Sequence, residues 1–326
     1  MKKSNNTIKS PNKHPIIAIV GPTGTGKSEL AVKIARKING EIISTDSRQV
    51  YRDLNIGSAK VKGRWKKDKK SGLSFFVYKN IPHHLLDFLP LEKTYSAGEF
   101  QKTAEKIIAD MRKRGKNPVI AGGTGFWTDS LIFGYKLPDV PPNRKLRRKL
   151  TKKKPAELFK ILKRLDAARA ANIEKENPRR LLRAIEIVAA LGKVPKLTRR
   201  KKYETLWLGI YPEKNKLSDL IKKRADKMIK KGLIAETKKL IRKTTRQKIK
   251  ELGFEYQTSL DYLEGKLTRK EFTDELAKKT IAYAKRQMRW FKRNKDIKWF
   301  SDAKTAFRHF TDSVLFRSKK RDQKIS

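Results

Sequence analysis

The chain has 326 residues, of which 82 are lysine or arginine and 33 are acidic, so its formal charge at pH 7 is +49. The absence of cysteine excludes disulfides, thiolate metal sites and cysteine nucleophiles. The length predicts one large or two modest domains, and the charge favours a polyanionic partner, with nucleic acid as the leading candidate and a generally lysine-rich composition as the alternative.

The first predicted elements form a βαβ unit. The apolar run "PIIAIV" at 15–20 predicts a buried strand, the spacing of Leu30, Ile34 and Ile38 predicts a helix, and "EIIST" at 41–45 predicts a second strand. This order predicts parallel pairing with a right-handed crossover. The polar segment 1–14 is predicted to be a disordered tail, without a run long enough for a signal peptide or a membrane span.

The remaining elements predict an α/β core interrupted by a helical insertion. The charged stretch 60–80 predicts a hairpin or a mobile loop, and "PVIA" at 118–121 predicts another buried strand, so the first part of the core covers 15–137. Prolines near Pro138 begin a mainly helical, basic insertion over 138–203. A return strand at 206–211 and three amphipathic helices complete the core over 204–315, and 316–326 is predicted to be a disordered basic tail.

The motif "GPTGTGKS" lies between the first strand and the first helix, which is the context of a P-loop. Glycines allow successive N–H groups to face one anion, Lys27 adds a positive charge, and the Ser28 hydroxyl suits Mg²⁺. The fold class is therefore predicted to be P-loop NTPase-like, with a parallel sheet flanked by helices. A P-loop binds linked phosphates, which leaves open whether the ligand is a nucleotide or another diphosphate.

Polar residues follow the second predicted strand. Asp46 lies at the carboxyl edge of the sheet, where ligands of open α/β folds bind, and a carboxylate there suits proton abstraction or Mg²⁺ binding. A turn cap is the alternative role for Asp46 and Ser47. Arg48 and Gln49 carry long donors that suit phosphates or base edges, and equally a solvated surface. The adjacent His83 and His84 are predicted to be structural or adjacent to the substrate, and a zinc site is not expected because no third ligand is near.

Nine stretches in order resemble the tRNA dimethylallyltransferase family, also called tRNA isopentenyltransferase. They are "GPTGTGKS", "DSRQVYRDLNIGSAK", "PHHLLD", "YSAGEFQ", "AGGTGFW", "NPRRLLRAIE", "MIKKGLIAE", "ELGFEYQ" and "KRQMRWF", over roughly residues 15–300. The resemblance implies transfer of a dimethylallyl group from dimethylallyl diphosphate to N6 of adenosine 37, in tRNAs that read UNN codons. It also implies Mg²⁺ as cofactor, the tRNA anticodon arm as partner, and a monomeric, cytoplasmic protein without membrane association.

The resemblance also implies residue roles. Asp46 would be the general base, and Thr23 and Arg224 would act with it on the reacting groups. The diphosphate would be bound by Gly21, Pro22, Thr23, Gly24, Thr25, Gly26, Lys27 and Ser28, with Mg²⁺ on Ser28. The tRNA would be contacted by Asp46, Ser47, Arg48, Gln49, Thr124, Arg147, Arg179, Arg180, Leu181, Leu182 and Arg183.

The sequence departs from the family pattern in two places. The segment 62–79 is longer and more basic than the pattern, and an arginine often found before Arg224 is replaced around Leu217–Leu220. Two other functions remain alternatives. One is an ATP-dependent P-loop kinase of a small metabolite, and the other is a non-catalytic RNA-binding P-loop protein.

Overall fold

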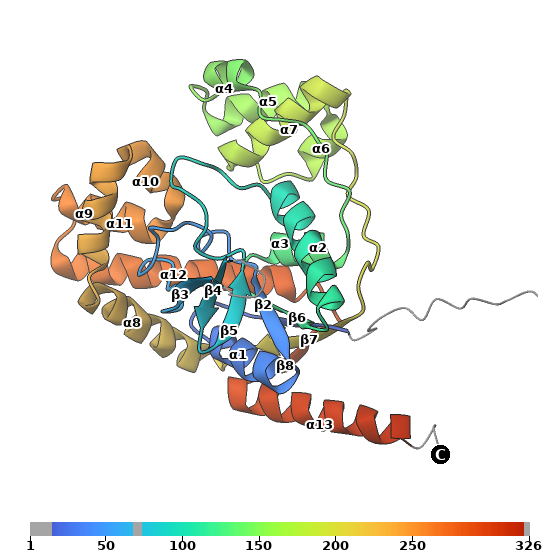
Figure 1. Ribbon diagram of the computed structural model, residues 1–326. Helices are drawn as coiled ribbons and strands as arrows, with labels where there is room; N and C mark the ends of the chain where they lie inside the picture. The colour runs from blue at the N-terminus through green and yellow to red at the C-terminus, as the bar shows by residue number, and fades with distance from the viewer. Residues whose placement is uncertain (1–14, 68–73, 323–326) are drawn as a thin grey trace, which may run out of the picture. The chain divides into compact units, whose positions relative to one another are not determined.

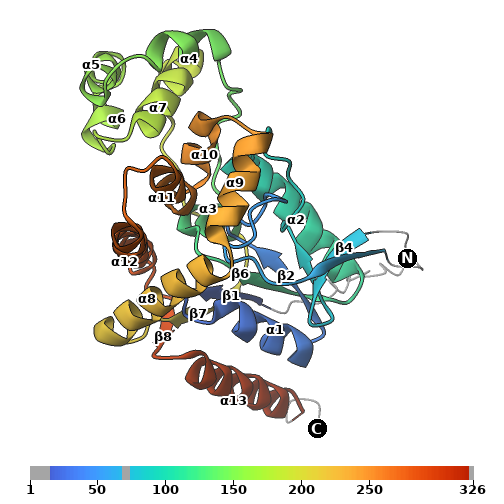
Figure 2. The same cartoon turned by 90° about the vertical axis from the view of Figure 1, so that its left-hand side faces the viewer.

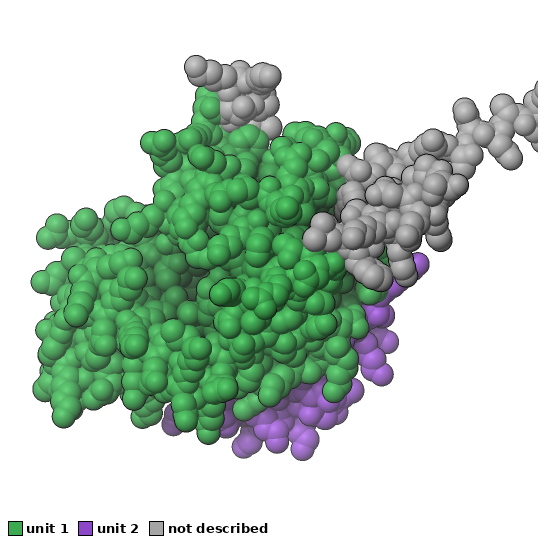
Figure 3. Space-filling model, turned by 90° about the horizontal axis from the view of Figure 1, so that it is seen from below, with its two compact units in different colours: residues 1–133, 201–326 green, residues 134–200 purple. Residues whose placement is uncertain are grey.

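The computed structural model describes residues 15–67 and 74–322, and the chain divides into two compact units. The core unit comprises residues 1–133 and 201–326, and the insertion unit comprises residues 134–200 (Figure 3). The predicted boundaries, 138 and 203, lie a few residues later. The backbone leaves the core unit after residue 133 and returns to it at residue 201. The two crossing points lie side by side, since the Lys202 N–H donates to the Ile132 carbonyl at 3.0 Å.

The core unit is built on one eight-stranded sheet with the order β3-β4-β5-β2-β6-β1-β7-β8 (Figure 1). Six strands are parallel: β1 (Ile16–Val20), β2 (Gly40–Ser44), β5 (Ile81–His84), β6 (Asn117–Ala121), β7 (Thr205–Ile210) and β8 (Lys298–Phe300). Two strands, β3 (Arg64–Lys67) and β4 (Ser74–Tyr78), form an antiparallel extension at one edge. The α/β fold with a mainly parallel sheet is therefore confirmed.

Helices cover both faces of this sheet (Figures 1 and 2). α1 (Lys27–Lys37) and α13 (Ala303–Asp322) pack on one face, and α2 (Ala97–Lys113) and α3 (Gly125–Ile132) lie on the other. The remaining helices of the unit are α8 (Lys214–Lys230), α9 (Leu233–Lys243), α10 (Arg246–Leu252), α11 (Phe254–Leu263) and α12 (Arg269–Phe291). The core between α1, the sheet and α13 is formed by fully buried aliphatic and aromatic side chains such as Ile19, Ile34 and Phe310.

The C-terminal part of the core unit differs from the sequence prediction. Six helices follow β7 where three were predicted, because short turns such as the one at Gly232, with φ of 96°, divide the basic amphipathic stretch. Helix α13 continues to Asp322, whereas a disordered tail was predicted from 316; no glycine or proline interrupts residues 303–322. The predicted tail 1–14 and the residues 323–326 lie outside the described residues.

The insertion unit consists of four helices, α4 (Arg144–Leu150), α5 (Pro155–Leu165), α6 (Ala167–Ala171) and α7 (Pro178–Leu191). Asn177 caps α7, since its side chain accepts the Arg180 N–H at 3.2 Å. Leucines of α5 and α7, including Leu158, Leu162 and Leu181, form its core. Within residues 15–67 and 74–322, no helix is long and apolar enough to cross a bilayer.

Candidate functional site

The P-loop connects β1 to α1 and is shaped by close backbone contacts. A Cβ on Gly21 would lie 2.3 Å from the Ile210 carbonyl oxygen of β7, so only glycine fits beside that strand. Gly26 caps α1 with φ of 84°, and no side chain caps the helix. The N–H groups of the first helical turn are therefore left for a ligand, and the helix dipole favours an anion there.

Two cations converge on this loop. The Lys27 ammonium donates to the Pro22 carbonyl at 2.5 Å, and the Cδ of Arg224 on α8 lies 3.5 Å from the position of a Cβ on Gly24. Burial and the neighbouring Arg224 guanidinium lower the pKa of Lys27 to about 7, and burial also lowers the pKa of Arg224. The positive charges of Lys27 and Arg224 repel each other, and a bound diphosphate would relieve this repulsion.

Asp46 follows β2 and organises the next turn. Its Oδ1 accepts the N–H of Arg48 at 2.9 Å and the N–H of Gln49 at 3.4 Å. The predicted alternative of a turn cap is thus a real role of this carboxylate, and it orients the side chain by fixing one oxygen. The Asp46 charge favours the protonated forms of both Lys27 and Arg224, so the carboxylate interacts electrostatically with the P-loop cations.

The turn after β6 lies against the same segment. The Thr124 hydroxyl accepts the Ser47 N–H at 3.1 Å, and the Thr124 N–H donates to the Thr45 carbonyl at 3.0 Å. The tertiary fold therefore brings together two segments that the sequence separates by 77 residues.

The side chains of Arg48 and Gln49 make contacts within the protein. Arg48 Nη1 donates to the Glu251 carbonyl at 2.6 Å, and Gln49 Nε2 donates to the Ser58 carbonyl at 3.1 Å. These bonds hold the loop after Asp46 against its neighbours. RNA contacts by these two residues would have to use their remaining donors or exchange these bonds.

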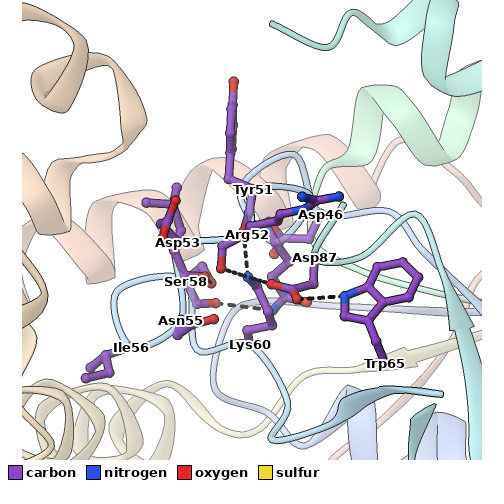
Figure 4. A network of polar contacts seen from close by, with 12 residues as sticks. Asp46, Tyr51, Arg52, Asp53, Asn55, Ile56, Ser58, Lys60, Trp65 and Asp87 are labelled. Atoms are coloured by element: carbon purple, nitrogen blue, oxygen red, sulfur yellow. Dashed lines mark hydrogen bonds and ion pairs between the residues drawn. The ribbon is translucent and has the colours of Figure 1, made fainter. Parts of the chain in front are cut away.

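A lysine and an aspartate hold the other end of this loop. The buried Lys60 ammonium donates to the carbonyls of Tyr51 and Arg52 and to Asp87 Oδ1, the last at 2.5 Å (Figure 4). The Asp87 N–H donates to the Gln49 carbonyl at 2.9 Å. Asp87, in the turn after β5, is thereby bound to both ends of the stretch 49–60. It forms a buried ion pair with Lys60 and a backbone hydrogen bond with Gln49.

Three further residues of the site were not singled out from the sequence. Gln287 of α12 accepts the Thr23 N–H at 3.0 Å and donates to the Gly123 carbonyl at 2.9 Å, so it joins the P-loop to the turn after β6. Glu255 of α11 and Tyr283 of α12 interact with the charges of Asp46 and Arg48. The stretches "ELGFEYQ" and "KRQMRWF" contain Glu255 and Gln287 as parts of the family resemblance, whereas Tyr283 lies outside both.

Burial changes the pKa values of Glu255 and Tyr283. It raises the pKa of Glu255 to about 7, although the guanidinium groups of Arg48 and Arg224 favour the charged form. Burial also raises the pKa of Tyr283. The site thus contains one carboxylate, Asp46, that is held by backbone N–H groups, and one carboxyl group that is desolvated.

The residues fit a magnesium ion that is held mainly by phosphate. No cluster of three acidic or histidine side chains suited to a metal occurs in residues 15–67 and 74–322. Ser28 lies in the first turn of α1, among the N–H groups that suit a diphosphate. Mg²⁺ commonly keeps several waters and binds through few protein ligands plus substrate phosphates, which matches this donor set.

The predicted tRNA-contact residues of the insertion unit include some with structural roles. Arg147 forms a two-pronged ion pair with the buried Glu186, at 2.6 and 2.9 Å. Leu181 is fully buried in the core of this unit, so its side chain is inaccessible. Arg180 pairs with Glu174 on the surface at 3.1 Å. Arg179, Leu182 and Arg183 also belong to α7.

The two adjacent histidines are structural, as predicted. His83 is buried with its Nδ1 2.9 Å from the Ile81 carbonyl, and burial lowers its pKa to about 4. His84 Nε2 lies 2.8 Å from Glu41 Oε2.

Comparisons with known proteins give one consistent result. The sequence matches the family described as IPP transferase over residues 49–294 and the family described as isopentenyl transferase over residues 14–69. It is 36% identical over 308 residues to a tRNA dimethylallyltransferase of Anoxybacillus flavithermus, covering 92% of each chain. It is 37% identical over 324 residues to a tRNA dimethylallyltransferase of Staphylococcus aureus, covering 94% of this chain and 99% of that protein.

Solved structures agree with the sequence comparisons. The full-length tRNA isopentenylpyrophosphate transferase of Bacillus halodurans matches with a TM-score of 0.67 at 30% identity, covering 95% of this chain and 99% of that one. A eukaryotic dimethylallyltransferase acting on tRNA matches with a TM-score of 0.69 at 28% identity, covering 88% of this chain and 73% of that one. With a P-loop, an edge carboxylate and these relatives over nearly its whole length, the chain belongs to the IPP transferase family, that of the tRNA dimethylallyltransferases.

Proposed function

We propose that this protein transfers a dimethylallyl group from dimethylallyl diphosphate to N6 of adenosine 37 in tRNAs that read UNN codons. The observation that carries the proposal is the meeting of Asp46 with the P-loop cations Lys27 and Arg224. This arrangement suits a reaction in which one group loses a proton while a diphosphate leaves. The relatives named tRNA dimethylallyltransferase favour it over a metabolite kinase or a non-catalytic RNA-binding protein.

The chemistry assigns a task to each side of the site. The adenine N6 lone pair forms a bond to C1 of the dimethylallyl group, the C1–O bond breaks, and its electron pair leaves with the diphosphate. Asp46 accepts the N6 proton, which lets a weakly nucleophilic exocyclic amine react. The N–H groups of Arg48 and Gln49 donate to Asp46 Oδ1 and so keep the carboxylate oriented during this step.

The P-loop side stabilises the leaving group. The loop Gly21–Ser28, with the Thr23 backbone held by Gln287, would bind the diphosphate through its remaining N–H groups and its hydroxyls, and Arg224 would add its guanidinium. Mg²⁺ bound through Ser28 and phosphate oxygens would neutralise charge that develops on the diphosphate. We further propose that the protein acts as a monomer, because one chain supplies every residue assigned to the reaction, and that it meets its tRNA substrate in the cytoplasm.

Substrate RNA would be recognised by both units. The proposed contacts are Asp46, Ser47, Arg48, Gln49 and Thr124 in the core unit and Arg147, Arg179, Arg180, Leu182 and Arg183 in the insertion unit. The target base would leave its stack to reach Asp46.

The test replaces Asp46 by asparagine. Asp46→Asn keeps an Oδ1 acceptor for the turn and removes the base, so the kcat for transfer should fall by about 10²- to 10⁴-fold, and the Kd for tRNA should change far less. Purified protein is incubated with dimethylallyl diphosphate, Mg²⁺ and an unmodified UNN-reading tRNA. The tRNA is then digested to nucleosides, and mass spectrometry measures the gain of C5H8 on adenosine.

A nearby aspartate provides the matched control. Asp53 forms an ion pair with Lys243 at 2.6 Å at the surface, and Asp53→Asn should leave transfer nearly unchanged. A wild-type protein that adds no C5H8 and instead consumes ATP would overturn the proposal in favour of a kinase. Full activity of Asp46→Asn would remove only the role of this carboxylate.

A further inference from the structure

Trp65 on the outer strand of the sheet has no role in the proposed reaction. All four residues of β3 are exposed, and β3 is an edge of the sheet. Trp65 is 45% exposed, and among residues 15–67 and 74–313 it is the only aromatic of the large exposed hydrophobic side chains. It lies in the segment 62–79, where the sequence departs from the family pattern.

The indole ring is held in one orientation. Its Nε1 donates to Asp87 Oδ2 at 3.1 Å, and the ring packs edge-on against its cross-strand partner Phe76, with 6.1 Å between centroids and 83° between planes. A ring fixed at its edge while nearly half of its surface stays accessible is pre-organised for stacking, because little conformational entropy is lost on binding.

Hydrogen bonds connect Trp65 to the segment that carries Asp46. Asp87 accepts the Trp65 N–H with one oxygen and donates its own N–H to the Gln49 carbonyl. Trp65 is thus two bonded contacts away from Gln49, at the end of the segment 46–49. Figure 4 shows Trp65 bonded to Asp87, with Lys60 on the other oxygen and Asp46 in the same view.

Basic residues flank Trp65 along the chain. Lys62, Arg64, Lys66 and Lys67 are all exposed. Charged side chains on an edge strand also discourage pairing with another sheet, which accounts for the lysines and not for an exposed indole. An aromatic ring among cations is the combination that binds single-stranded nucleic acid, by base stacking and phosphate contact.

We propose that Trp65 stacks on an unpaired base of the substrate tRNA and that Lys67 contacts an adjacent phosphate. Side chains alternate along a strand, so Lys67 lies on the face of β3 that carries Trp65, whereas Lys66 pairs with Phe75 and lies on the other face. The proposal rests on tRNA being the substrate, and it adds an RNA contact to those that the family resemblance implies.

The test measures binding of a labelled, unmodified anticodon stem-loop and transfer to the full tRNA. Trp65→Ala should raise the Kd for RNA by about 5- to 100-fold and lower kcat/KM for tRNA equally, because one stacked base is lost. The KM for dimethylallyl diphosphate and the midpoint of urea unfolding should stay at their wild-type values. A stable Trp65→Ala protein that binds RNA within twofold of wild type would overturn the proposal and leave β3 free for a protein partner.

Two adjacent lysines form a matched pair. Lys67→Ala should weaken RNA binding more than Lys66→Ala, although both changes remove one exposed charge. Equal effects would mean that the charge acts without a defined contact and would contradict the assigned face.

A fluorescence measurement covers the case in which Trp65→Ala does not fold. The difference in acrylamide quenching between wild type and Trp65→Phe reports on Trp65 alone among the five tryptophans. Protection of that signal by the stem-loop is expected, and unchanged quenching in a saturated complex would contradict stacking. Wild-type protein that transfers no dimethylallyl group would refute the proposed function, whereas normal transfer by Trp65→Ala would refute only this inference.

Discussion

At the scale of single residues, Gln287 shows how one buried amide can position a phosphate loop. Its Oε1 accepts from the Thr23 backbone and its Nε2 donates to the Gly123 backbone, and the side chain is 6% exposed. A side chain with both a donor and an acceptor at one end is needed to satisfy these two groups. Gln287 is therefore a positioning residue, since it acts on the diphosphate through Thr23.

Replacing Gln287 by methionine should expose this role. Gln287→Met keeps the approximate volume and leaves the Thr23 N–H and the Gly123 carbonyl unpaired, which should lower the free energy of unfolding by about 1–3 kcal/mol. The KM for dimethylallyl diphosphate should rise while the Kd for tRNA changes little. Urea unfolding and steady-state kinetics measure both effects.

Gln247 is the control for that change. It is exposed on α10, with only a 3.5 Å contact to Glu251, so Gln247→Met should alter neither stability nor KM. A Gln287→Met protein with wild-type KM would show that the P-loop keeps its shape without this amide.

At the scale of elements, α9 holds the loop that follows the Asp46 segment. The Glu236 carboxylate accepts N–H groups from Asn55, Ile56 and Gly57, at 2.9–3.2 Å, and the Tyr256 hydroxyl of α11 at 2.8 Å. Successive backbone N–H groups that point to one place bind an anion strongly. Glu236 of α9 thus fixes residues 55–57, and Tyr256 of α11 holds the Glu236 carboxylate in place.

Glu236→Gln is expected to loosen this attachment. The amide presents an NH₂ group to backbone donors, so the free energy of unfolding should fall by about 1–3 kcal/mol and kcat/KM for tRNA should fall with it. Denaturant titration and the transfer assay provide the two readouts.

The same substitution at the start of α8 tests specificity. Glu213 is exposed and makes no side-chain cap hydrogen bond, so Glu213→Gln should behave as wild type. If Glu236→Gln and Glu213→Gln behave alike, the loop is held by other contacts.

At the scale of the whole molecule, the charge of +49 predicts strong salt dependence of tRNA binding. Each neutralised phosphate releases counterions, so a contact area of six to ten phosphates should weaken binding by about 10³-fold or more between 50 and 200 mM salt. Equilibrium binding of an unmodified tRNA over a salt series measures the slope. Dimethylallyl diphosphate has far fewer charges, and its KM should vary much less over the same series.

The sequence by itself determined the local elements and the first half of the site. Strand β1, the P-loop, helix α1 and the position of Asp46 after β2 were all predicted, because apolar periodicity and glycine spacing act within a few residues. The order of the nine family stretches also predicted the family to which the chain belongs.

Only the tertiary structure decided which distant polar groups meet. Gln287 binds the backbone of Thr23 across 264 residues, Glu236 binds residues 55–57 from α9, and Arg147 uses its guanidinium on Glu186. Such contacts leave no periodic trace in the sequence, because each depends on how separate elements pack. For the same reason, the sequence predicted Trp65 only as part of a charged hairpin or loop. Its hydrogen bond to Asp87 and its exposed ring became visible only in the folded chain.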